Sequence, residues 1–164
     1  GGGVASERRV QTQAMCNLME ARADAMHLII AWPNAFVPSS FYGWTNSHVV
    51  TTENVLDLCR AADLVVSAAG YNSFHEAHYN HIPTILLPQS APFLDDQEAR
   101  ARAAERRGTA ALVMDTDLVH LEREVSAFLD GTKADDVRAA LHAQTLPAPG
   151  NAAAARLIEM GASR

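Results

Sequence analysis

The sequence predicts a three-layer α/β fold, in which a mostly parallel sheet of about five or six strands lies between helices. Short apolar runs typical of buried parallel strands, such as 27–31 and 84–87, alternate with longer segments of helical periodicity. The stretch from Ala62 to Ala104 shows this order most clearly, because it reads as strand, loop, helix, strand, loop and helix. Strands connected in this way run parallel, so we expect both loops to open at the same edge of the sheet.

The first third of the chain is expected to supply two helices and two strands. A helix runs from Ser6 to about Ala25, and its core-facing stripe consists of Val10, Ala14, Leu18 and Ala21. Strands follow at 26–32, which Pro33 ends, and at 47–50. A helix at 53–61 then leads into the central stretch. The three glycines at the start fit either a native glycine-rich loop before the first helix or an engineered linker.

The central stretch contains a turn of small residues between a strand and a helix. The apolar run 64–66 stops at the turn 67–70, and Asn72 and Ser73 are both good N-cap residues. Glu76 follows Ser73 by three positions, which is the capping-box spacing. Free backbone N–H groups at such a helix start, reached through small residues, form a phosphate site. The plainer interpretation is a short βα turn without a ligand, in which Glu76 serves only as a helix cap.

The remaining segments complete the alternation. A strand at 84–87 ends at Pro88, and the following loop ends in Asp95-Asp96-Gln97. The next helix spans 95–107 and is expected to end at Gly108 in the left-handed conformation. A last strand is predicted at 109–114, and helices are predicted at 118–129, 133–143 and 151–160.

Length and composition limit the domain organisation and the class of partner. With 164 residues, 48% of them hydrophobic and 20% charged, the chain has the balance of one globular domain, to which we assign residues 1–164. The net charge of −6 argues against nucleic acid or an anionic membrane as the main partner. No apolar run approaches the roughly 18 residues of a membrane span, and the sequence does not begin with a signal peptide. We interpret Cys16 and Cys59 as buried free thiols in a reducing compartment. With these observations on apolar runs and on the start of the sequence, the cysteines lead us to expect a cytoplasmic protein.

In order and spacing, the central stretch resembles the C-terminal, donor-binding domain of GT-B glycosyltransferases, in particular glycosyltransferase family 28, the family of the peptidoglycan N-acetylglucosaminyltransferase. The matching residues are Ala62-Asp63, Ser67, Gly70, Ser73 with Glu76, Pro83 with Pro88, and Asp96-Gln97. The resemblance covers most of the chain and implies a Rossmann-like domain, the C-terminal half of a GT-B fold. The glycines at the start would then form the loop after a first strand that this sequence does not contain.

The resemblance also implies a role for individual residues. The turn and helix start would hold the nucleotide diphosphate, Glu76 would bind the ribose hydroxyls, and Asp96 and Gln97 would face the donor sugar. The nucleobase would lie against residues 50–52. Tyr71 departs from the family pattern, because the family often has a small residue at this turn. The expected donor-binding residues are Gly2, Gly3, Thr52, Ser67, Gly70, Tyr71, Asn72, Ser73, Glu76, Gln89, Asp96 and Gln97.

The function that the resemblance implies is transfer of a sugar from a nucleotide diphosphate sugar, expected to be UDP-linked, to an acceptor hydroxyl. No metal or other cofactor is expected, because helix amides can stabilise the diphosphate. The general base is expected in an N-terminal acceptor-binding domain or a partner subunit, so the isolated domain should be inactive or nearly so. Two alternatives are a sugar-nucleotide epimerase of the same fold and a non-catalytic nucleotide-sugar-binding subunit of a split transferase. A third, a metal site at His75, His78 and His81, lacks the H-E-x-x-H spacing.

Overall fold

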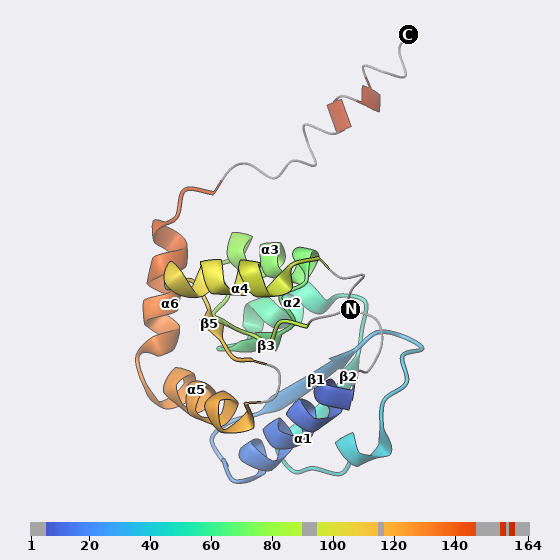
Figure 1. The fold of residues 1–164 in the computed structure, drawn as a ribbon. Helices are drawn as coiled ribbons and strands as arrows, with labels where there is room; N and C mark the ends of the chain where they lie inside the picture. The colour runs from blue at the N-terminus through green and yellow to red at the C-terminus, as the bar shows by residue number, and fades with distance from the viewer. Residues whose placement is uncertain (1–5, 90–94, 115–116, 147–154, 157, 160–164) are drawn as a thin grey trace.

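The structure, a computed structural model, describes residues 6–89, 95–114, 117–146, 155–156 and 158–159. Helices and strands alternate through most of this part of the chain (Figure 1). In order they are α1 (Ser6–Glu20), β1 (His27–Ala31), the 3-10 helix η1 (Ser39–Phe41), β2 (Ser47–Thr51), α2 (Val55–Ala61), β3 (Val65–Ser67), α3 (Tyr71–Tyr79), β4 (Thr84–Leu86), α4 (Gln97–Arg106), β5 (Ala111–Leu112), α5 (Leu118–Asp130) and α6 (Lys133–Ala143). Four described residues of the helix expected at 151–160, namely 155–156 and 158–159, are helical, and the rest of it lies outside the described residues.

All paired strands run parallel, which confirms the predicted α/β class. The strands do not form one continuous sheet, however. β1 pairs with β2, from His27 beside Ser47 to Ala31 beside Thr51, while β3, β4 and β5 form a second sheet in that order. The expectation of a single sheet is therefore wrong for the described residues, because β1 and β3 are not hydrogen-bonded to each other.

Helices cover both faces of the sheet formed by β3, β4 and β5 (Figure 1). Side chains of adjacent residues in a strand point to opposite faces, and the core divides accordingly. On one face, Ile85 and Leu87 join a buried cluster with residues of α1, α5 and α6. On the other, Leu86 and Leu112 join a second cluster with residues of α3 and α4. This arrangement is the predicted three-layer architecture.

Helix α1 ends five residues earlier than the sequence pattern predicts, at Glu20 instead of Ala25. The side chain of Asn46, just before β2, donates hydrogen bonds to the carbonyls of Met19 (3.1 Å) and Arg22 (3.0 Å). Carbonyls at a helix end lack intrahelical partners, so this distant side chain fixes where α1 stops. The Glu20 carboxylate in turn accepts the main-chain N–H of Thr45 at 2.9 Å.

Two further expectations had different outcomes. Gly108 follows α4 with φ +70°, the left-handed conformation predicted for it. Both cysteines are free thiols. Cys16 is buried as expected, whereas Cys59 on α2 is half-buried, so the expectation of burial is wrong for Cys59.

No helix in the described part of the chain has the length and apolar character needed to cross a lipid bilayer.

Candidate functional site

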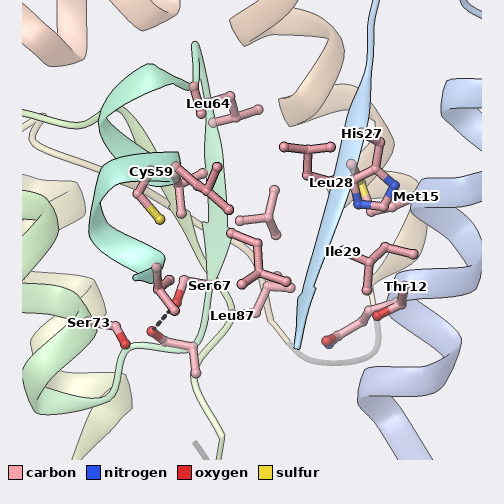
Figure 2. A pocket seen from close by; sticks show the side chains of 18 of the residues that line it. Thr12, Met15, His27, Leu28, Ile29, Cys59, Leu64, Ser67, Ser73 and Leu87 are labelled. Atoms are coloured by element: carbon pink, nitrogen blue, oxygen red, sulfur yellow. Dashed lines mark hydrogen bonds between the residues drawn. The ribbon is translucent and has the colours of Figure 1, made fainter. Parts of the chain in front are cut away.

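A large cavity lies between β1 and β3 and reaches the loops at the carboxyl ends of both strands. Its volume is about 1690 Å³. Figure 2 shows Leu28 and Ile29 of β1 on one side, and Leu64 and Cys59 on the other. Ligands of open parallel sheets bind at the carboxyl ends of the strands. Seven of the predicted donor-binding residues line this cavity, namely Ser67, Gly70, Tyr71, Asn72, Ser73, Gln89 and Gln97.

Helix α3 begins one residue after Gly70, which is its N-cap. Gly70 has φ −61° and ψ 149°, and no side chain caps the helix. The predicted capping box is therefore wrong. Ser73 is the third residue of α3, one turn too late to cap it, and Glu76 lies in the second turn. The amino acid types matched the motif, but the small residue at the turn determines where the helix begins.

The start of α3 has the properties of an anion site. The main-chain N–H groups of Tyr71, Asn72 and Ser73 belong to the first turn, where the helix itself offers no acceptor. All three residues are exposed, and the turn contains no acidic residue. A Cβ atom added at Gly70 would meet no atom within 4 Å, so the space beside the turn that precedes α3 is open. The helix dipole adds partial positive charge at this end.

The ring of Tyr71 packs along α3 and towards α4. Its centroid lies 4.3 Å from that of the His75 ring and 5.6 Å from the guanidinium carbon of Arg100. Tyr71 remains 62% exposed. The bulky residue that departs from the family pattern is therefore held against two neighbouring side chains at the edge of the site.

Arg100 joins the two loops at the carboxyl ends of β3 and β4. One guanidinium nitrogen donates to the carbonyl of Ala69 at 2.5 Å, and another pairs with the carboxylate of Asp95 at 2.5 Å. The guanidinium also lies 5.8 Å from the ring centroid of Phe74. Sequence reasoning did not single out Arg100, because α4 and its end also contain Arg102, Arg106 and Arg107, and local pattern does not distinguish them.

Gln97 and Asp96, predicted to face the donor sugar, have different surroundings. Gln97 is only 4% exposed, and its Oε1 accepts the main-chain N–H of Gln89 at 3.0 Å. Gln97 also lines the cavity. Asp96 is exposed and caps α4, since its carboxylate accepts the N–H of Ala99 at 2.9 Å. The contact of Asp96 with a sugar stays a prediction.

Glu76 is exposed on the second turn of α3 and does not line the cavity. Its position beyond the first turn excludes the alternative in which it serves as a helix cap. Burial, and to a smaller extent the charge of Glu76, raise the pKa of the Cys59 thiol on α2. Thr52 lies between β2 and α2, where its hydroxyl accepts the N–H of Asn54 at 2.9 Å. Gly2 and Gly3 lie outside the described residues.

The three histidines of α3 and its end do not converge. His78 is buried, and its ring bonds the Phe74 carbonyl and the Thr109 hydroxyl, each at 3.1 Å. Its burial lowers its pKa. His75 packs on Tyr71, and His81 stacks on His142 with ring centroids 4.0 Å apart. Among the described residues, no three His, Cys, Asp or Glu side chains are grouped closely enough to hold a metal.

Comparison with known proteins gives a match to one family model and to several transferases. The model of the glycosyltransferase family 28 C-terminal domain matches residues 19–146, well over half of the chain. The chain is 35% identical over 65 residues to UDP-N-acetylglucosamine--N-acetylmuramyl-(pentapeptide) pyrophosphoryl-undecaprenol N-acetylglucosamine transferase of Moorella thermoacetica, an alignment covering 40% of this chain and 18% of that protein. It is 36% identical over 77 residues to the same-named transferase of Desulforamulus reducens, covering 47% and 20%. The alignments thus span about a fifth of these relatives.

Two solved structures have a similar fold. The spinosyn rhamnosyltransferase SpnG in complex with spinosyn aglycone superposes with a TM-score of 0.62 and 19% identity, covering 91% of this chain and 40% of that one. The spinosyn forosaminyltransferase SpnP gives a TM-score of 0.61 and 16% identity, covering 96% and 41%. At this level of identity the likeness concerns the fold, which is the C-terminal half of a GT-B fold.

Proposed function

This chain belongs to the family of glycosyltransferase family 28 C-terminal domains, and on that premise we propose that it is the donor-binding domain of a glycosyltransferase that uses a UDP-sugar. The observation that carries the proposal is the uncapped, exposed start of α3, which opens into the cavity at the carboxyl ends of the strands. The relatives that match the sequence are named as transferases, which favours transfer over the epimerase and the non-catalytic subunit.

In the proposed complex the diphosphate of the donor lies at the amides of Tyr71, Asn72 and Ser73. During transfer, negative charge grows on the departing diphosphate, and preorganised N–H groups stabilise that charge as it forms. The nucleobase lies against residues 50–52, the ribose lies towards Glu76, and the sugar lies towards Asp96 and Gln97. Gln97 supports this orientation because it lines the same cavity as the start of α3 but belongs to another helix, as the first residue of α4.

The acceptor and the general base belong to a part of the protein beyond this chain. We propose an N-terminal acceptor-binding domain, since both similar structures are more than twice as long as the segment that this chain covers. We also propose a cytoplasmic location, which the free thiols of Cys16 and Cys59 support. Because helix amides supply the positive charge, the proposal needs no metal ion.

Calorimetry and thermal unfolding with UDP and with uridine test the donor site. UDP at 100 times its dissociation constant should stabilise the domain by about 2.7 kcal/mol, which corresponds to a rise in Tm of roughly 5–10 °C. Uridine should have little effect, and EDTA should not change the response to UDP. The absence of any shift with nucleoside diphosphates at millimolar concentration would refute the proposal.

Glu76→Gln tests the ribose contact separately. The change keeps the shape of the side chain but removes the charge that accepts two hydroxyl hydrogen bonds, which is worth about 1.5–3 kcal/mol. UDP affinity should fall at least about tenfold. Because Glu76 does not cap α3, the stability of the unliganded domain should stay the same. Unchanged UDP affinity would remove Glu76 from the site and leave the diphosphate site intact.

A further inference from the structure

We propose that Trp32 holds the nucleobase of the donor by stacking its indole ring on it. Trp32 directly follows β1, is 55% exposed and lines the cavity at the carboxyl ends of the strands. It is not among the donor-binding residues expected from the sequence. The inference rests on the proposed function, because it concerns the base of the same donor.

Trp32 lies beside the residues to which the nucleobase is assigned, residues 50–52. Strands β1 and β2 are paired in register as far as Ala31 beside Thr51, and the Ala31 carbonyl accepts the N–H of Thr52 at 3.1 Å. Trp32 and Thr52 are the first residues after the two strands, so they lie next to each other at the carboxyl edge. A base placed against β2 therefore has Trp32 as its neighbour from β1.

The alternation of side chains along β1 determines the side on which the indole ring lies. Adjacent side chains of a strand point to opposite faces, so Trp32 continues the row of Leu28 and Ile30. Figure 2 shows Ile29 on the side of β1 where Met15 of α1 lies, and Leu28 on the other side, in the cavity. The ring of Trp32 therefore lies on the side of β1 that is turned away from α1.

A tight turn fixes the backbone of Trp32. The Ala35 N–H donates to the Trp32 carbonyl at 3.0 Å, which closes a turn of four residues. Pro33 is the second residue of this turn, and Asn34, the third, has φ +65°. Proline at the second position and a positive φ at the third are the features of a type II turn. Because proline fixes its own φ, the backbone that carries the ring is already ordered without a ligand, which lowers the entropic cost of binding.

The other exposed aromatic residue of this loop has a different partner. Phe36 is 70% exposed, and the guanidinium carbon of Arg9 on α1 lies 5.8 Å from its ring centroid. In the part of the chain that the structure describes, the side chain of Trp32 makes no hydrogen bond, ring contact or cation–π contact. Its large aromatic face is therefore available to a planar ligand in the cavity.

Stacking adds a property that the start of α3 does not have. Amides at a helix start recognise negative charge, so by themselves they bind inorganic pyrophosphate as readily as the diphosphate of a nucleotide. Removing an aromatic side chain from a base stack weakens binding roughly 5- to 150-fold. Every base has an aromatic face, so Trp32 would favour nucleotides over pyrophosphate and leave the choice of base to other groups.

Calorimetric titration with UDP and with pyrophosphate tests the proposal. Trp32→Ala should raise the Kd for UDP about 5- to 150-fold and leave the Kd for pyrophosphate unchanged. Trp32→Phe retains an aromatic face and should restore most of the affinity for UDP. Trp44→Phe is the matched control and should not change either Kd. Trp44 is the second tryptophan of the chain, lies outside the described lining of the cavity, and donates its indole N–H to the Ser40 carbonyl at 2.9 Å.

Tryptophan fluorescence provides a second measurement that does not require the alanine variant to fold. The chain contains two tryptophans, so Trp32 is the only one left in Trp44→Phe. UDP should quench the emission of this variant, with a midpoint equal to the calorimetric Kd, and pyrophosphate should leave the emission unchanged.

The outcomes separate this inference from the proposed function. If UDP binds wild type and Trp32→Ala equally well, or if it leaves the emission of Trp44→Phe unchanged, the stacking role is wrong and the donor site stands. An equal loss of affinity for UDP and pyrophosphate in Trp32→Ala would also overturn the inference, because Trp32 would then support the fold or the diphosphate site. Failure of wild type to bind UDP at all would overturn the proposed function and this inference with it.

Discussion

The guanidinium of Arg100 and the carbonyl of Ala69 are joined by a hydrogen bond of 2.5 Å that links the first turn of α4 to the turn before α3. The same side chain pairs with Asp95 and lies near the ring of Tyr71. The two loops of the candidate site, which are separate in sequence, are therefore held by one residue. Since Ala69 immediately precedes the N-cap Gly70, Arg100 positions the amides to which we assign the diphosphate.

Arg100→Lys is expected to weaken UDP binding without unfolding the domain. Lysine keeps the charge but cannot hold Ala69 and Asp95 together with one planar fork. Losing this constraint should cost about 1–2 kcal/mol of binding free energy, a roughly 5- to 30-fold rise in Kd by calorimetry. Arg102→Lys is the matched control, because Arg102 is on the same helix and its partner among the described residues is Glu98, one turn away on that helix. Equal Kd values for the two variants would contradict the positioning role.

Gly70→Ala should separate stability from binding. The added methyl group meets no atom within 4 Å, and φ −61° suits alanine. Two effects on the unliganded domain oppose each other. Alanine restricts the unfolded chain, which stabilises the domain by about 0.4–1 kcal/mol, but alanine is a poorer N-cap residue than glycine, so the free energy of unfolding should change by less than about 1 kcal/mol. UDP affinity should fall at least about tenfold, since the methyl group adds bulk at the turn through which the diphosphate reaches the amides. Urea unfolding and calorimetry on one preparation measure both quantities, and unchanged affinity would show that the diphosphate does not approach here.

Substitutions of Asp96 and Gln97 should weaken binding of the donor sugar without changing the affinity for the nucleotide. Asp96→Asn retains an N-cap for α4, and Gln97→Ala removes the amide that lines the cavity. Each change should lower the preference for a UDP-sugar over UDP by about 1 kcal/mol, one hydrogen bond, with UDP affinity nearly constant. Titration of each variant with UDP and with several UDP-sugars measures the difference. An equal loss for UDP and UDP-sugar would mean that this loop serves the nucleotide or the fold.

His78 should make the stability of the domain depend on pH. Burial lowers its pKa in the folded state below the ordinary 6.5, so folding favours the neutral ring. The contribution of the neutral ring to the free energy of unfolding is complete above pH 6.5. It is lost as the pH falls from that value towards the folded pKa, and the free energy of unfolding then decreases by at most about 1.4 kcal/mol per pH unit. His78→Gln should flatten the decline in urea-unfolding free energy between about pH 7 and 5. His27 is half-buried, and desolvation lowers its pKa as well, so part of the decline should persist. An identical slope in the variant would contradict this role.

Features set by neighbouring residues were predictable from the sequence. The apolar run at β4, the helix at 133–143 and the left-handed Gly108 each follow from short-range periodicity or backbone freedom. The capping box failed for a related reason. Ser73 and Glu76 have the residue types and the spacing of a capping box, but both lie inside α3, because the helix begins earlier, directly after Gly70. A motif gives the residue types, and only the backbone gives the position within the helix.

Features set by distant residues were not predictable. Arg100 and Ala69 are 31 positions apart, and Asn46 ends α1 from 27 positions after Met19. Local pattern carries no information on such pairs. The division into two sheets has the same origin, because each strand could be recognised from its own residues, but whether β1 and β3 are neighbours depends on the rest of the sheet.

Among the described strands, β1 and β3 each lie at the edge of a sheet, and these edges affect how the purified domain behaves in solution. Unpaired strand edges are templates for pairing with another chain, and natural proteins cover or charge them. In a concentrated sample, the most abundant source of a pairing strand is a second copy of the same chain. Its acidic character opposes such encounters at neutral pH, where the net charge is −6, and fails to oppose them near the pI of about 5.6. Dilute, neutral, low-salt buffers should therefore keep the domain monomeric, and mildly acidic ones should promote aggregation.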